Sequence, residues 1–325
     1  MACLAHILKP YEIFYQIDGA SPIDFKNGIQ IKNHNLYGKN FSLPLSLEDL
    51  RVINRDTSWI SDAKETIEII KEHKIKIVIT DLPAISQIWI SEIKKHSLIV
   101  VFDDMPTSKI KADLIINPNN ASDFQSLYST FDGKNILIGQ EFNPVNKSYY
   151  QSQCNPKKQI ERILVYLGSS VSLDTTNKII ETALNTGKNT EYIGEHSAKL
   201  RKCFGGNKSF QAVNFVKDFH YHLKKYDICI GACGVAYWER CHFGIPSLIL
   251  KTAENQQKDI EYLIGRGAIK KIKSNSIEQS LKETFSEFEE NPGLLTELSK
   301  KSYSIVKGSY TVDLSELILG CINAS

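Results

Sequence analysis

The chain has 325 residues, 42% of them hydrophobic, and its 39 Lys and Arg nearly balance 37 Asp and Glu, leaving a net charge of +2. This length allows two domains with separate cores, and the scattered positive charge gives no basic surface for nucleic acid or an anionic membrane. No apolar run reaches the roughly 20 residues that span a bilayer, and no export signal is visible, so we expect no membrane insertion.

Seven cysteines at irregular spacing predict reduced thiols and a cytoplasmic protein. Three of them, Cys229, Cys233 and Cys241, lie close together in the sequence. Because no CxxC pair is present, we expect neither a metal nor another cofactor there.

The first residues look like the body of an apolar helix without its beginning. Met1–Leu8 has no Ser, Thr, Asp or Asn ahead of it to serve as an N-cap. Tyr11–Ile17 then alternates like a strand. An α/β domain that begins within a helix is unusual.

The rest of the first half alternates between helical and strand patterns, as a parallel sheet requires. We expect helices over 62–74 and 88–95, and strands over 75–79, 98–102, 114–116 and 136–138. Asp81, Asp103 and Asp104 follow two of these strands, where they either cap the next turn or contact a substrate. The polar, aperiodic segment Asn146–Gln159 predicts a linker between domains over residues 1–146 and 160–325.

The second half continues the same rhythm. We expect strands over 162–167, 189–193, 212–216 and 267–272, and helices over 197–203, 277–290 and 293–307. A further helix runs through Leu184 and is expected to be capped by Asp174. The apolar residues 311–322 are expected to pack back across the domain junction. On a helix, residues two apart diverge by about 200°, so His220 and His222 predict an exposed helix and no metal site.

Residues 226–257 form the most informative stretch. An apolar strand, Ile228–Ile230, breaks into Gly231-Ala232-Cys233-Gly234, and a helix over 235–243 follows. Gly244 suits the left-handed conformation that ends a helix. A second strand over 247–250 leads to Glu254-Asn255-Gln256, which begins another helix.

This pattern predicts a phosphate site. Small residues at Gly231, Ala232 and Gly234 let backbone N–H groups approach a ligand, and the following helix N-terminus adds partial positive charge. Glu239, one turn later, could accept hydrogen bonds from two sugar hydroxyls. The alternative is a tight strand-to-helix turn with a surface Glu.

The segment GACGVAYWERCHFGIPSLIL…AENQQ resembles the UDP-2,4-diacetamido-2,4,6-trideoxy-β-L-altropyranose hydrolases of pseudaminic acid biosynthesis. More distantly, it resembles glycosyltransferases of the GT-B type. The match is dense over about thirty residues and weaker through most of the chain. The resemblance implies an α/β fold of two doubly wound Rossmann-like domains facing across a cleft, with UDP in the second and the sugar in the first.

The resemblance also implies roles for individual residues. The glycine turn meets the diphosphate, Glu239 meets the ribose, and Asn255 lies beside the sugar carbon that water attacks. Glu254 and Gln256 flank Asn255 as further substrate contacts. After strand 162–167 the family tends to have two glycines and an Asp; here Gly168, Ser169 and Ser170 supply N–H groups and hydroxyls for a phosphate.

One catalytic group of the family has no counterpart in these 325 residues. Family members begin with a strand, a glycine turn and a GHxxR segment whose His is the general base, followed by a helix resembling ACLAHIL. His6 lies on an apolar stripe and is expected to be a packed helix residue. The Tyr that the family carries after Asp81 is also missing, because this chain reads Asp81-Leu82-Pro83. Either the start codon has been placed too late, which we favour, or the His has been lost.

The sequence therefore predicts a metal-independent UDP-sugar hydrolase of nonulosonic acid biosynthesis. The alternatives are a nucleotide-sugar glycosyltransferase on the same scaffold and a non-catalytic UDP-sugar binder that contacts other enzymes of that pathway. A nicotinamide dehydrogenase is disfavoured because no G-x-G-x-x-G follows a strand.

Overall fold

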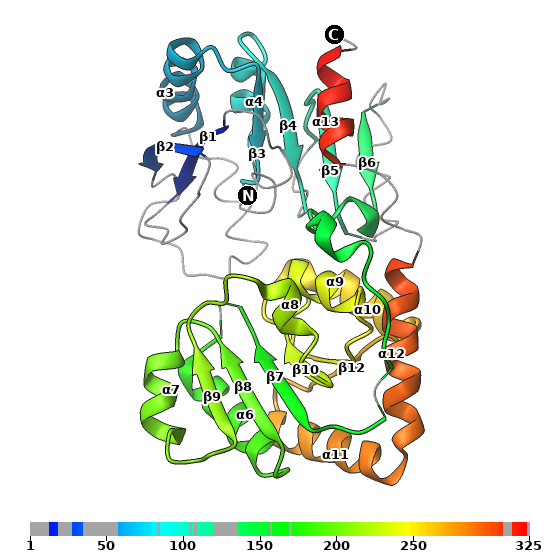
Figure 1. The fold of residues 1–325 in the computed structure, drawn as a ribbon. Coiled ribbons are helices and arrows are strands. Elements are labelled where there is room, and N and C mark those ends of the chain that lie inside the picture. The colour runs from blue at the N-terminus through cyan, green and yellow to red at the C-terminus, as the bar shows by residue number, and fades with distance from the viewer. Residues whose placement is uncertain are drawn as a thin grey trace. The chain divides into compact units, whose positions relative to one another are not determined.

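The computed structural model describes residues 13–18, 28–34, 58–82, 85–104, 106, 109–119, 135–156, 158–168, 171–307 and 314–323. The predicted helix Met1–Leu8, with His6, lies outside these ranges. The chain divides into two compact units (Figure 1): Met1–Asn146 with Tyr310–Ser325, and Lys147–Ser309.

The main sheet of the first unit has four parallel strands in the order β3-β4-β5-β6. They are β3 (Ile77–Thr80), β4 (Leu98–Phe102), β5 (Leu114–Asn117) and β6 (Ile136–Ile138). The apolar run LIVVF forms β4, as expected for a parallel strand that is covered on both faces. A separate parallel pair, β1 (Ile13–Asp18) and β2 (Gly28–His34), and the 3-10 helix η1 (Gln140–Phe142) complete the described part.

Helices cover both faces of this sheet. Residues Ile99 and Val101 of β4 pack with α3 (Ser58–His73) and α4 (Gln87–Ile93). The alternate residues, Val100 and Phe102, pack with Leu314 and Ile318 of α13 (Leu314–Asn323). The C-terminal helix therefore belongs to the first unit (Figure 1), and the predicted domain over 160–325 differs from the observed unit in this last segment.

The second unit is built on six parallel strands in the order β12-β11-β10-β7-β8-β9. Its strands are β7 (Arg162–Tyr166), β8 (Asn189–Ile193), β9 (Phe210–Val213), β10 (Ile228–Gly231), β11 (Ser247–Ile249) and β12 (Lys270–Lys271). Its helices are η2 (Lys147–Tyr149), α6 (Leu173–Leu184), α7 (Ser197–Phe204), α8 (Phe219–Leu223), α9 (Val235–Cys241), η3 (Glu254–Gln256), α10 (Gln257–Gly265), α11 (Ile277–Glu290) and α12 (Pro292–Val306).

The chain order of these strands reverses beside β7. Strands β7, β8 and β9 follow one another toward one edge, and the chain then returns to place β10 on the other side of β7. In a doubly wound sheet, such a switch point is where the carboxyl ends of the strands leave room for a ligand. The apolar core that supports it includes Ile163, Val165, Ile228 and Ile230.

Several local predictions in the second unit differ from the structure, among them a helix cap and the bounds of a strand. Helix α6 is capped by Ser172, whose hydroxyl accepts from Thr175 N at 3.2 Å, whereas the predicted cap, Asp174, lies in the first turn and pairs with Lys178. The predicted strand 267–272 is reduced to β12, because Gly267 is left-handed at φ 63° and ends α10.

The predicted linker contains well-packed residues. Tyr149 is only 3% exposed, and the ring of Tyr150 stacks on His242 at a centroid distance of 5.7 Å. Polarity and lack of periodicity did not reveal these contacts, because they are made with residues about ninety positions later.

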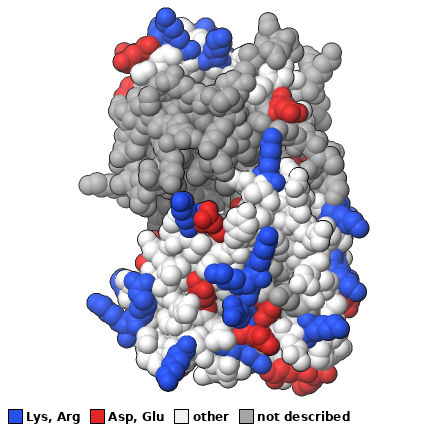
Figure 2. Space-filling model, in the orientation of Figure 1, with Lys and Arg blue, Asp and Glu red and all other residues white. Residues whose placement is uncertain are grey.

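On the face shown in Figure 2, Lys and Arg side chains are dispersed among Asp and Glu over the described surface. None of the helices in the described ranges combines the length and apolar composition needed to cross a bilayer.

We predict that Gly244→Ala destabilises the second unit. Gly244 has φ 62°, and a Cβ there would collide with the Sγ of Cys154 and lie 3.0 Å from the carbonyl oxygen of Ser299. The loss should be about 1–3 kcal/mol, measured by urea unfolding. The matched control is Gly206→Ala, where a Cβ would have no neighbour within 4 Å. Equal unfolding midpoints for the two variants would contradict the prediction.

Candidate functional site

Three turns lie at one edge of the second sheet. Strand β10 pairs in parallel with β7 and β11, so that Gly231 lies opposite both Tyr166 and Ile249. The turn that contains Gly168, the turn Gly231–Gly234 and η3 therefore follow the carboxyl ends of three adjacent strands. The structure thus gathers the predicted site segments at the point where the strand order reverses.

Gly231 is the tightest position of the site. A Cβ at this residue would lie 2.7 Å from the backbone oxygen of Tyr166, so no side chain fits without movement of the backbone. Gly234 faces open space instead, with no atom within 4 Å of a Cβ built on it. Among the described residues, the backbone N–H groups of Cys233 and Gly234 donate to no backbone carbonyl.

Gly168 ends the neighbouring strand in the left-handed conformation, with φ 77°. A Cβ there would meet no atom within 4 Å, so its backbone also borders open space. Ser169 and Ser170, the other predicted phosphate contacts in this turn, lie outside the described residues.

Glu239 is partly buried in the second turn of α9. Burial raises the pKa of its carboxyl to about 7, while the guanidinium of Arg240 and a hydrogen bond from the Tyr149 hydroxyl oppose that shift. Tyr149 belongs to η2 and was missed from the sequence because it lay in the segment interpreted as a linker. The carboxyl group is therefore poised to change its charge near neutral pH.

The positive charge at the glycine turn has a source that the sequence did not suggest. Helix α9 has only seven residues, so the dipole expected from its N-terminus is small. The guanidinium of Arg240 lies under the turn instead, fully buried, and its Nη2 donates to the carbonyl of Ala232 at 3.0 Å. The only signal for it in the sequence was that Arg240 directly follows Glu239 within the largely apolar stretch VAYWERCHF.

The segment after β11 is ordered by its own contacts. Gln256 accepts from the backbone N–H of Thr252 at 3.1 Å, and its amide donates to the hydroxyl of that residue at 3.0 Å. Glu254 is exposed and pairs with Lys251 at 2.9 Å. Asn255 lies between them and is partly buried. Of the three predicted contacts, Glu254 and Gln256 already have partners within this loop.

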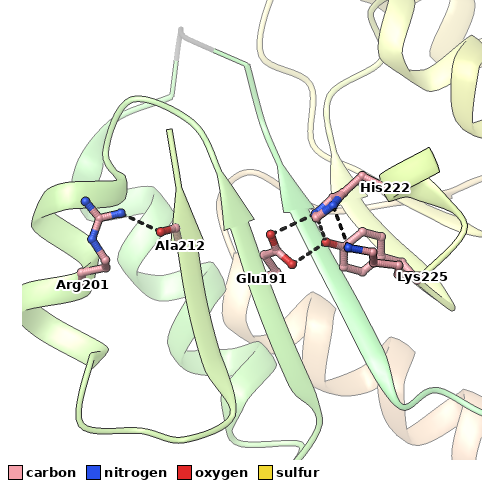
Figure 3. Close-up of polar contacts among 6 residues, drawn as sticks. Glu191, Arg201, Ala212, His222 and Lys225 are labelled. Carbon is pink, nitrogen blue, oxygen red and sulfur yellow. Dashed lines mark hydrogen bonds and ion pairs between the residues drawn. The ribbon is translucent and has the colours of Figure 1, made fainter. Parts of the chain in front are cut away.

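The two histidines of α8 contact different groups, and both are partly buried, so the predicted exposed helix was wrong. His220 Nε2 lies 3.2 Å from the hydroxyl of Ser152, whereas His222 points to Glu191 of β8, 3.0 Å away (Figure 3). The Lys225 ammonium, 3.1 Å from His222 Nδ1, can only donate, so the His222 Nε2–H donates to Glu191. This network fastens α8 to the sheet.

A cavity of about 210 Å³ lies at the opposite end of the strands from the glycine turn. Its lining includes Arg162 and Asn189, the first residues of β7 and β8, with Lys208 and Lys225. All four side chains are exposed, and we assign no ligand to it. Within the described ranges, no group of three or more His, Cys, Asp or Glu is arranged to hold a metal ion.

No family model matches the sequence, and no curated protein matches it. Solved structures do match. S. aureus MnaA in a co-structure with UDP has a TM-score of 0.58 at 15% identity, covering 98% of this chain and 91% of that one. The UDP-GlcNAc 2-epimerase from Neisseria meningitidis bound to UDP-GlcNAc has a TM-score of 0.56 at 11% identity, covering 88% and 84%. The calicheamicin glycosyltransferase CalG4 has a TM-score of 0.58 at 12% identity, covering 88% and 83%.

At these identities the likeness shows the fold alone. The chain has the GT-B fold of two Rossmann-like α/β domains, as predicted from the sequence.

We predict that Glu239→Gln stabilises the folded protein at high pH. The pKa of Glu239 rises from 4.5 to about 7 on folding, so its stabilising contribution is fully present below pH 4.5 and is lost as the pH rises to about 7. A glutamine side chain does not ionise, so the variant does not lose stability in this way. The free energy of unfolding of the variant, relative to wild type, should therefore increase by on the order of 1–2 kcal/mol between pH 5 and pH 8.

Thermal unfolding at both pH values measures this difference. Glu283→Gln, at an exposed position of α11, is the matched control and should show no such increase. A difference for Glu239→Gln that stays constant from pH 5 to pH 8 would show that this carboxyl does not titrate as described.

Proposed function

We propose that this protein binds a UDP-sugar and hydrolyses it, releasing UDP and a free 2,4-diacetamido-2,4,6-trideoxyhexose for pseudaminic or related nonulosonic acid biosynthesis. The observation that carries the proposal is the strand-order reversal between β7 and β10, with close backbone approach at Gly231 and a partly buried carboxyl at Glu239. Such switch points are the usual ligand sites of doubly wound sheets.

The turn and the carboxyl group suit the two halves of a nucleoside diphosphate. The N–H groups of Cys233 and Gly234, which donate to no backbone carbonyl among the described residues, suit phosphate oxygens, and the Glu239 carboxylate suits two ribose hydroxyls. Two proteins of similar fold carry such ligands: MnaA is in a co-structure with UDP, and the Neisseria epimerase is bound to UDP-GlcNAc. These ligands support the choice of UDP for the second unit.

Hydrolysis requires stabilisation of the charge on the leaving UDP, orientation of the attacking water and transfer of a proton from that water. The oxygen of water attacks the anomeric carbon, the bond from that carbon to the diphosphate oxygen breaks, and UDP leaves with the electron pair. The turn after β10 would stabilise the charge that develops on UDP, and Asn255 would orient the water. Asn255 cannot accept the proton that water loses, because an amide is not basic. That proton passes to solvent water, and without a positioned general base the rate should be lower by roughly 10²- to 10⁴-fold.

A second candidate is a nucleotide-sugar glycosyltransferase, in which a hydroxyl of an acceptor replaces water. The similarity in fold to the glycosyltransferase CalG4 favours it. Transfer to an acceptor, with little UDP release in its absence, would select this alternative. The remaining hypothesis is a protein that binds UDP-sugar without turnover and acts as a partner of other pathway enzymes. Binding without either reaction would select it.

We predict that Glu239→Ala and Asn255→Ala separate binding from chemistry. The first should weaken UDP affinity about tenfold, because ribose loses its acceptor, and the second should retain UDP affinity and lose hydrolysis. Calorimetry measures binding, and UDP release from the UDP-sugar measures turnover. Glu283→Ala on α11 is the control and should change neither. Unchanged UDP affinity in Glu239→Ala would refute the proposed nucleotide site.

We also predict that uridine affinity rises with pH. Ribose hydroxyls need the ionised Glu239, whose pKa in the free protein is about 7, so raising the pH from 6 to 8 increases the ionised fraction. Affinity should increase about tenfold over that interval and then level off. Uridine has no phosphate to titrate, and Glu239→Gln serves as a pH-independent reference. A flat wild-type profile would count against ribose binding at this carboxylate.

A further inference from the structure

We infer that Arg240 is a buried counter-charge for an anion bound at the turn Gly231–Gly234, and that the affinity of this turn for phosphates depends on it. The inference rests on the proposed function and extends it to a positioning residue that does not contact the ligand. Arg240 is 0% exposed, so its guanidinium acts from within the protein.

The guanidinium is held by neutral groups. Its Nε donates to the hydroxyl of Ser247 at 3.1 Å, and its Nη2 donates to the carbonyl of Ala232 at 3.0 Å. Its Cζ lies 5.6 Å from the centre of the Tyr237 ring. These contacts fix the position of the cation between the ends of β10 and β11.

The charge of Arg240 acts through space on the Glu239 carboxyl but is not directly paired within the described ranges. No carboxylate among the described residues forms an ion pair with Arg240, and its Nη1 has no hydrogen-bond partner among them. Burying an unpaired charge and leaving a buried N–H without a partner both destabilise the folded protein. An anion bound at the turn would offset this cost.

The guanidinium lies directly behind the turn. A Cβ on Gly231 would be 3.3 Å from both Nη1 and Nη2, so the cation packs against this backbone. In a trans peptide the C=O and the following N–H point in opposite directions. Because the Ala232 carbonyl points to Arg240, the N–H of Cys233 points away from it, toward an incoming ligand.

The field of the guanidinium reaches its neighbours. Burial raises the pKa of the Cys229 thiol and of the Glu239 carboxyl, and in both groups the charge of Arg240 opposes that shift. The same field would act on a phosphate at the turn. The class of ligand indicated is therefore an anion with several acceptor oxygens, such as a phosphate or a diphosphate.

A purely structural role is the alternative. Arg240 also joins the turn to Ser247 at the start of β11, and its loss would then weaken every ligand of this edge alike. The two roles are distinguished by comparing an anionic ligand with a neutral one that shares its nucleoside.

The experiment measures UDP, uridine and inorganic pyrophosphate binding by calorimetry in the full chain, for wild type, Arg240→Lys, Arg240→Met and Arg240→Gln. We expect Arg240→Met and Arg240→Gln to lose on the order of tenfold in affinity for UDP and pyrophosphate, and less than twofold for uridine. Arg240→Lys, which keeps the charge, should retain most of the affinity for UDP. Ser247→Ala, which removes one hydrogen bond and leaves the charge, should keep the ratio of UDP to uridine affinity.

Other outcomes would distinguish the role of Arg240 from the binding of UDP. Equal losses for UDP and uridine, or no loss in the neutral variants, would overturn the role of Arg240 while leaving UDP binding intact. Pyrophosphate binding that depends on Arg240, without any UDP binding by wild type, would support the buried counter-charge and reject the nucleotide. Circular dichroism confirms folding. If neither neutral variant folds, equal wild-type affinities for uridine and UDP would overturn the inference, because the diphosphate would then gain nothing from a counter-charge at the turn.

Discussion

The close approach of Gly231 to its surroundings is the constraint on which the candidate site depends. The carbonyl oxygen of Tyr166 and the guanidinium of Arg240 both lie close to the position that a Cβ of this residue would occupy. A residue without a side chain is required there, and the same geometry aligns β10 with β7 and turns the Ala232 carbonyl inward. The close packing at Gly231 thus links three features: the strand pairing at the switch point, the conformation of the turn and the position of the Arg240 guanidinium.

Apolar runs predicted the sheet well, because strands covered on both faces must consist almost entirely of apolar residues. Leu98–Phe102 and Ile136–Ile138 have the expected bounds, and the strand and glycine turn at 228–234 lie as expected. The failures concern contacts between distant residues. Pattern alone could not show that Tyr149 would meet Glu239, or that Arg240 would be buried without a carboxylate, because both depend on the folded arrangement.

The candidate site separates the groups suited to binding from those suited to reaction. The proposed cradle for the diphosphate and ribose belongs to β10 and α9, within one contiguous core, and does not require a particular sugar or acceptor. Asn255 belongs to the next strand-to-helix connection, whose neighbours Glu254 and Gln256 bond within their own loop. Proteins of this fold could therefore keep one nucleotide cradle while their chemistry changes, since the two depend on different segments.

The place of α13 has a consequence for biosynthesis on the ribosome. The second unit is continuous in sequence, from Lys147 to Ser309, so all of its strands have emerged before the last residues are translated. The first unit needs Leu314 and Ile318 to cover one face of its sheet. Although its strands are made first, its core stays incomplete until α13 has been translated, so the order of completion is the reverse of the order of translation.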